Sequence, residues 1–105
     1  MALLAEDSDE AASFHACRAA AHEQQLDPGR LAQAGAYAGA LAWGGHVAKR
    51  GRPGTVERAR DLVTDAAYAF IGETAKEGHI DPEGVRAAKQ QARDRLDELV
   101  RAEYA

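Results

Sequence analysis

The fold is decided by residues 27–50, which read DPGRLAQAGAYAGALAWGGHVAKR. Asp27 followed by Pro28 is typical of a helix start, because Asp caps free backbone amides and proline at the first helical position has no amide to leave unsatisfied. Alanine, the strongest helix former, dominates the residues after Pro28. We therefore expect a helix over residues 28–48. Its expected apolar stripe is Leu31, Ala34, Ala38, Leu41 and Gly45.

Small residues recur one helical turn apart within this stretch, most clearly at Gly35 and Gly39. A helix face with so little side chain lets a neighbouring backbone approach closely. We therefore expect this helix to be the central one. Tyr37, Leu41 and Trp43 would supply the volume around it.

Three further helices are predicted outward from this one, and no strand pattern competes. Their starts carry capping residues: Ser8, Thr55 and a second Asp-Pro pair, Asp81-Pro82. Together the four expected helices cover residues 8–25, 28–48, 55–78 and 81–103. The sequence therefore predicts an all-α fold, in which residues 1–105 form a single domain, a four-helix bundle built from two antiparallel helical hairpins.

An internal similarity supports this division of the chain. Residues 21–28 and 75–82 share Ala, Glu, an aliphatic residue, Asp and Pro at an offset of 54 positions. Duplication of a helical hairpin would explain the similarity. The alternative is two independent uses of a favourable turn between helices.

The expected core is thin, because 25 of the 105 residues are alanine within a hydrophobic share of 46%. At roughly 25 cal/mol per Å² of buried apolar surface, such a core leaves a small domain little margin. Close helix packing or self-association would add burial. The residues expected to serve helix packing or self-association are Gly35, Gly39, Leu41, Trp43, Leu96 and Leu99.

Several classes of protein are excluded by composition. A single cysteine, Cys17, makes no intrachain disulfide, so a disulfide-stapled secreted scaffold is excluded. No signal peptide is visible, and the most apolar stretch, residues 31–48, falls short of a membrane span. We expect a cytoplasmic protein with no membrane contact. The absence of Asn and the excess of Arg over Lys favour a GC-rich, bacterial genome.

Charge is distributed unevenly along the chain, whose net charge is −4. Residues 28–60 hold six bases against Glu57 alone, while the segments on either side are acidic. A local basic patch attracts phosphate or an acidic protein surface despite the overall sign. The bases expected to form a nucleic-acid-binding site are Lys49, Arg50, Arg52, Arg58 and Arg60.

Within this patch, residues 49–53 read Lys-Arg-Gly-Arg-Pro and resemble the core of the AT-hook, a short DNA-binding segment. The resemblance implies that Arg50 and Arg52 enter the narrow minor groove of A·T-rich DNA, with Gly51 close to its floor. The alternative is a structural turn, in which Lys49 and Arg50 complement the carboxyl end of the preceding helix.

Trp43-Gly44-Gly45 resembles the Trp-x-Gly turn of small secreted helical hairpins. The alternative is a tryptophan packed near the end of the second helix.

Nothing in the sequence indicates catalysis. His15 and His22 can share a helix face, but no acid or cysteine stands at a favourable spacing beside them. The chain contains no Glu-x-x-His pair for a di-iron bundle and no phosphate-binding glycine loop. His46 and His79 fall near predicted helix ends. We therefore expect no enzyme, no catalytic residue, no cofactor and no metal.

The function that the sequence favours is a small non-catalytic helical protein that acts in protein–protein interaction, in a regulatory or accessory role. Its expected partner is another protein or a second copy of itself, in a dimer or another homo-oligomer. The alternative is a DNA-binding regulator that uses the basic segment 49–60.

Overall fold

A computed structural model of the chain describes residues 3–20, 27–78 and 80–105, and within these ranges it contains α-helices and no strand. The helices are α1 (Asp9–Ala20), α2 (Pro28–Arg50), α3 (Val56–Gly78) and α4 (Pro82–Tyr104). The prediction of an all-helical fold is confirmed. Residues 21–25, where the first helix was expected to continue, lie outside the described residues.

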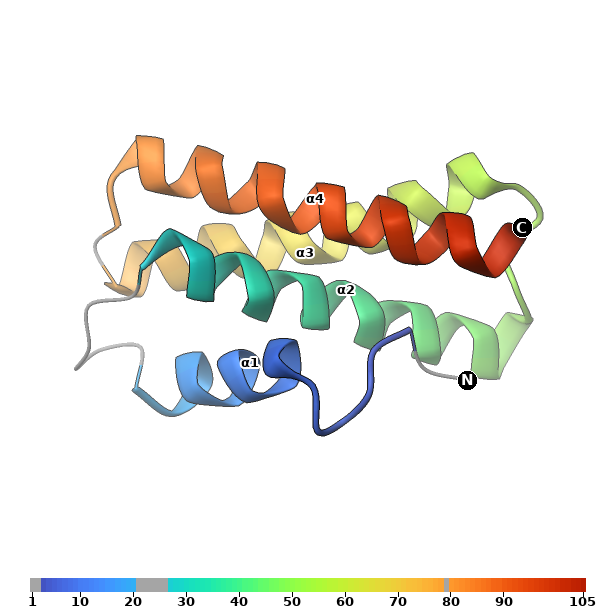
Figure 1. Cartoon of the computed structure of the whole chain (residues 1–105), viewed down its shortest axis with the longest axis horizontal. Helices are drawn as coiled ribbons and strands as arrows, with labels where there is room; N and C mark the ends of the chain where they lie inside the picture. Colours follow the sequence, from blue (N-terminus) through green and yellow to red (C-terminus); the bar gives the residue numbers. More distant parts are fainter. Residues whose placement is uncertain (1–2, 21–26, 79) are drawn as a thin grey trace.

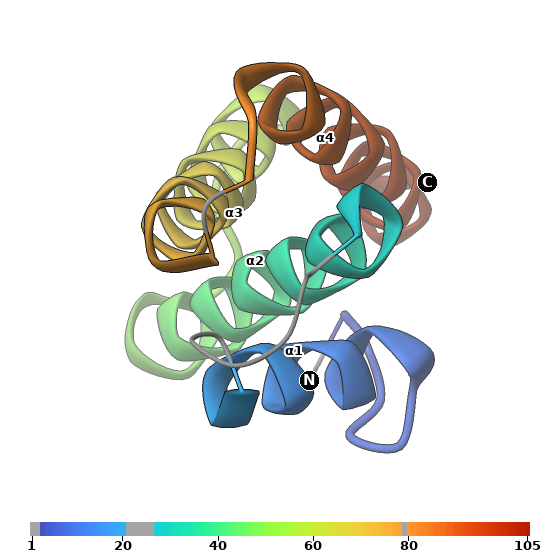
Figure 2. The same cartoon turned by 90° about the vertical axis from the view of Figure 1, so that its left-hand side faces the viewer.

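The central helix is α2, as the sequence predicted. It packs against α1 on one side and against α3 and α4 on the other, and α3 and α4 also pack together (Figure 2). Figure 1 shows the shorter α1 alongside the N-terminal half of α2, while α3 and α4 extend along its whole length. The arrangement is compatible with two antiparallel hairpins.

Side-chain caps fix the starts of all four described helices. In each case the capping oxygen accepts a hydrogen bond from the backbone amide three residues further on. The donor–acceptor distance is 2.7 Å at Asp27 and Asp81 and 3.1 Å at Ser8 and Thr55. The caps that the sequence predicted are therefore confirmed.

The end of α2 is fixed by glycine. The helix runs two residues further than predicted, to Arg50, because Lys49 and Arg50 are good helix formers whose charges favour a helix C-terminus. Gly51 leaves the helix with φ 76°, a left-handed conformation that favours glycine, and its N–H donates to the Val47 carbonyl at 3.0 Å.

The core is rich in alanine, which makes up half of the buried hydrophobic residues that the structure describes. The largest fully buried side chains are Trp43, Leu31, Ile71, Leu96, Val63, Val100 and Cys17. Trp43 lies within α2 and is 2% exposed, so the Trp-Gly-Gly sequence forms no turn. The interpretation of Trp43 as a packed residue near the end of the helix is the correct one.

The stripe predicted for α2 is wrong in its second half. Leu31 and Ala34 are fully buried, but Leu41 is 49% exposed and Gly45 is also exposed. The reason is that α1 lies alongside the first half of α2 and does not extend along its second half (Figure 1). In the second half of α2 the buried residues are Gly39, Ala40 and Trp43.

On α3, Ala67 and Ile71 form the second half of the buried row, and both are fully buried. Ile71 packs over Gly35 of α2, while Phe70 turns toward α1 and meets Phe14, with 5.1 Å between ring centroids. Because Phe70 contacts α1, its ring lies outside the interface between α2 and α3.

Candidate functional site

The five bases singled out in the sequence lie where α2 ends and α3 begins, and we call this group the basic corner. Its members are Lys49, Arg50, Arg52, Arg58 and Arg60. All are exposed except Arg60, which is half-buried. The fold therefore keeps these bases near one another, but it does not leave all of them free.

Arg52 is held by the last turn of α4. Its guanidinium donates to the Glu103 carbonyl at 2.9 Å and stacks 4.4 Å from the ring centroid of Tyr104. The Tyr104 hydroxyl in turn donates to the Pro53 carbonyl at 2.5 Å. We call these four residues the Tyr104 cluster. The cluster fastens the α2–α3 loop to the end of α4, so the loop is not an extended tail of the AT-hook kind.

The Tyr104 cluster also closes over the core. The rings of Tyr104 and Trp43 meet edge to face, with centroids 6.2 Å apart. A single aromatic side chain at the end of α4 thus contacts both the buried tryptophan of α2 and the loop that follows it.

Arg60 is also engaged within the chain. Its Nε lies 3.4 Å from an Asp97 carboxylate oxygen on α4, and both side chains are largely covered. This pair connects α3 to α4. Three exposed bases of the basic corner remain for which the structure shows no comparable contact with α4. They are Lys49, Arg50 and Arg58.

Gly35 and Gly39, predicted for close packing, face α3 and α4. A Cβ at Gly39 would stand 2.7 Å from the Val63 carbonyl oxygen and 2.8 Å from Leu96 Cδ1, and one at Gly35 would stand 2.6 Å from Ile71 Cδ1. These distances are too short for a real side chain. The two glycines are thus occupied by contacts within the chain.

The remaining packing candidates divide into two groups. Trp43 and Leu96 are buried, and Leu99 is half-buried at the edge of the core. Leu41 points outward, and among the residues that the structure describes it is the exposed large hydrophobic side chain.

Leu41 begins an exposed row of α2, which shares Gly45 with the stripe predicted from the sequence. Gly44, Gly45 and Ala48 follow it at helical spacing, and all three are exposed or half-buried. A Cβ added at either glycine would meet no atom of the described residues within 4 Å. We call these four residues the open face of α2. The signal in the sequence was a pair of glycines inside a helix, three and four residues after a leucine.

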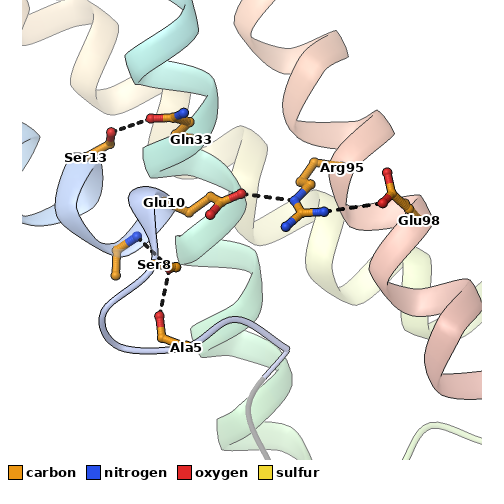
Figure 3. Close-up of polar contacts among 8 residues, drawn as sticks. Ala5, Ser8, Glu10, Ser13, Gln33, Arg95 and Glu98 are labelled. Atoms are coloured by element: carbon orange, nitrogen blue, oxygen red, sulfur yellow. Dashed lines mark hydrogen bonds and ion pairs between the residues drawn. The ribbon is translucent and has the colours of Figure 1, made fainter.

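Polar contacts join α1 to the rest of the fold (Figure 3). Arg95 of α4 lies between two carboxylates, 3.0 Å from Glu10 of α1 and 3.4 Å from Glu98. Ser13 of α1 donates to the Gln33 side chain of α2 at 2.6 Å. These contacts orient α1 across α2.

A polar groove of about 370 Å³ runs between α3 and α4. Its lining mixes acids such as Asp61 and Asp65 with Arg93 and with the Arg60–Asp97 pair. Four carboxylates and two guanidinium groups line the groove, so opposite charges partly cancel and a negative excess remains.

The described residues bring together no group of three or more His, Cys, Asp or Glu side chains that could hold a metal ion. Cys17 is fully buried, and burial raises the pKa of its thiol above the ordinary value of 9.0, which keeps it protonated and unreactive. His15 is exposed and lies edge-on to Phe14. His22 and His79 lie outside the described residues.

Comparison with known proteins adds no relative. The chain matches no protein-family model, no curated protein and no solved structure. Within the described ranges, every helix is too short or too polar to cross a membrane.

Proposed function

We propose that the chain is a small non-catalytic interaction module, built as two antiparallel helical hairpins and acting in a regulatory or accessory role in the cytoplasm. The observation that carries this proposal is the open face of α2. Leu41, 49% exposed, lies on it beside two glycines, and no described residue comes within 4 Å of a Cβ added at either glycine.

The glycines support the proposal because the isolated chain gains nothing from them. Glycine inside a helix costs about 1 kcal/mol relative to alanine. Gly35 and Gly39 compensate this cost by letting α3 and α4 approach, but no described residue approaches Gly44 or Gly45. A local feature that lowers stability without an internal gain is typical of a functional surface.

The proposal is tested by affinity capture from the cells that produce the chain, with wild-type and Leu41→Glu baits. The matched control is Ala87→Glu, which adds the same charge at an exposed position of α4. We expect a set of captured proteins that Leu41→Glu loses and Ala87→Glu retains. Identical capture by all three baits would contradict the proposal.

A second candidate function, DNA binding, is favoured by the exposed bases of the basic corner. Lys49, Arg50 and Arg58 project from two adjoining helix ends and would neutralise phosphates, with affinity that falls steeply as salt rises. Arg52 must leave the Tyr104 cluster before it can enter a minor groove. We therefore expect binding without preference for A·T-rich sequence.

Fluorescence anisotropy of labelled A·T-rich and G·C-rich duplexes over a salt series tests this candidate. Arg50→Ala with Arg58→Ala should weaken binding to both duplexes alike, whereas Arg93→Ala on α4 serves as the control for loss of a positive charge elsewhere. No binding at low salt would remove the DNA candidate and leave the interaction module untouched.

A further inference from the structure

Charged residues of opposite sign lie near the open face of α2. Beyond Ala48 the helix ends in Lys49 and Arg50, both exposed. The segment that precedes α1 turns below the middle of α2 (Figure 1) and carries Glu6 and Asp7, which are exposed as well. The two bases therefore adjoin the Ala48 end of the face, and the acidic segment lies toward its Leu41 end.

We infer that the open face of α2 binds a second copy of this chain, with the two α2 helices antiparallel about a two-fold axis. In this arrangement the basic end of each copy lies opposite the acidic segment of the other, and the attraction is made twice. A parallel arrangement would set the two basic ends against each other. The inference rests on the proposed function, since it names the occupant of the same face.

The side chains of the open face fit this symmetry. An axis that passes between Gly44 and Gly45 places these glycines opposite each other, where the absence of Cβ atoms lets the two backbones approach. The same register places Leu41 of each copy opposite the partner's Ala48. The large side chain thus meets a small one on both sides of the axis.

The expected dimer is weak. One half-exposed leucine per copy contributes far less than the roughly 800 Å² per partner of a standard interface. We therefore expect a Kd of roughly 10 to 100 µM, with affinity that falls as added salt screens the exposed charges.

Sedimentation equilibrium of the purified chain, from about 5 to about 500 µM, measures this association directly. We expect the wild type and Ala87→Glu to form dimers as concentration rises and Leu41→Glu to remain monomeric. Far-ultraviolet circular dichroism confirms that each variant is folded. A dimer that Leu41→Glu leaves intact would overturn the inference.

Charge reversal tests the antiparallel arrangement. Glu6→Lys with Asp7→Lys, or Lys49→Glu with Arg50→Glu, should each weaken the dimer by about tenfold or more. Combining all four reversals should restore it, because the two ends are again complementary. A combined variant as weak as either parent would overturn the antiparallel pairing.

The failure of this inference and that of the proposed function are distinguishable. A monomeric wild type together with Leu41-dependent capture of a different protein would overturn the second copy as occupant but leave the open face as a contact surface. A monomeric wild type with capture that does not depend on Leu41 would overturn both.

Discussion

The two halves of α2 are alike in sequence and differ in surroundings. Both are rich in small and apolar residues, yet Leu31 and Tyr37 in the first half are buried, while Leu41 and Gly45 in the second are exposed. The first half is enclosed by α1, α3 and α4, whereas α1 does not extend along the second half (Figure 1). The comparison teaches that the burial of an apolar helix is set by how far its neighbours extend and not by its own periodicity.

The largest expected effect compares two leucines of α2. Leu31→Ala should lower the free energy of unfolding by about 2 to 5 kcal/mol, because Leu31 is fully buried and its removal leaves a cavity. Leu41→Ala should change it by about 1 kcal/mol or less, because half of that side chain is already in water. Urea unfolding at low protein concentration, followed by circular dichroism, measures both. Equal losses would mean that the second half of α2 is covered as well.

Alanine substitutions at two glycines of α2 should give the next largest changes in the free energy of unfolding, and the two changes should have opposite signs. Gly39→Ala should cost about 1 to 3 kcal/mol, because its Cβ would press on the Val63 carbonyl of α3, which belongs to the backbone and yields little. Gly45→Ala should stabilise the monomer by up to about 1 kcal/mol, because alanine favours the helix and meets nothing. Thermal unfolding of both variants measures the difference. A destabilising Gly45→Ala would show that this position is not open.

The second half of α2 is closed at its end by the Tyr104 cluster, and Tyr104→Phe should weaken that closure. The loss of the hydrogen bond to the Pro53 carbonyl should cost about 0.5 to 1.5 kcal/mol. The ring contact with Trp43 remains, so the Trp43 emission should not shift. Tyr104→Ala, which also removes the ring, is the contrasting variant and should shift it. A shift with Tyr104→Phe alone would show that the hydroxyl positions the ring.

The smallest expected effect on the free energy of unfolding concerns the buried thiol of Cys17 on α1, the helix that lies alongside the first half of α2. Because burial raises the pKa of Cys17, the unfolded thiol ionises first as pH rises through 9.0. The contribution of the protonated thiol to stability is therefore complete below this pH and is lost above it. From about pH 8 to about pH 10, the free energy of unfolding should fall further in the wild type than in Cys17→Ala. Parallel falls would mean that the thiol is accessible to water.

The helix starts were predictable because their causes are local. Asp27 and Asp81 each accept a hydrogen bond from the backbone amide three residues further on, so acceptor and donor belong to the same short stretch of sequence. The covered side of α2 was not predictable. Small and apolar residues lie all around that helix, so the choice depends on the place where α1 crosses it, which the periodicity of α2 does not specify.

The candidate sites were predictable in part for the same reason. The bases of the basic corner are near neighbours in the sequence, so their grouping was visible. The partner of Arg52 was not, because Glu103 lies 51 positions further along and no spacing rule connects the two. Gly44 and Gly45 were visible as unusual helix residues, but their meaning depends on which face of α2 remains open.

The Tyr104 cluster also changes how the C-terminal turn of α4 should behave in hydrogen exchange. Terminal helical turns ordinarily open first, and their amides exchange with deuterium within the earliest time points. Here the last turn of α4 is fastened to the α2–α3 loop through Arg52 and Pro53. Its amides should therefore exchange together with those at the end of α2, as one opening unit formed from two segments that are far apart in the chain.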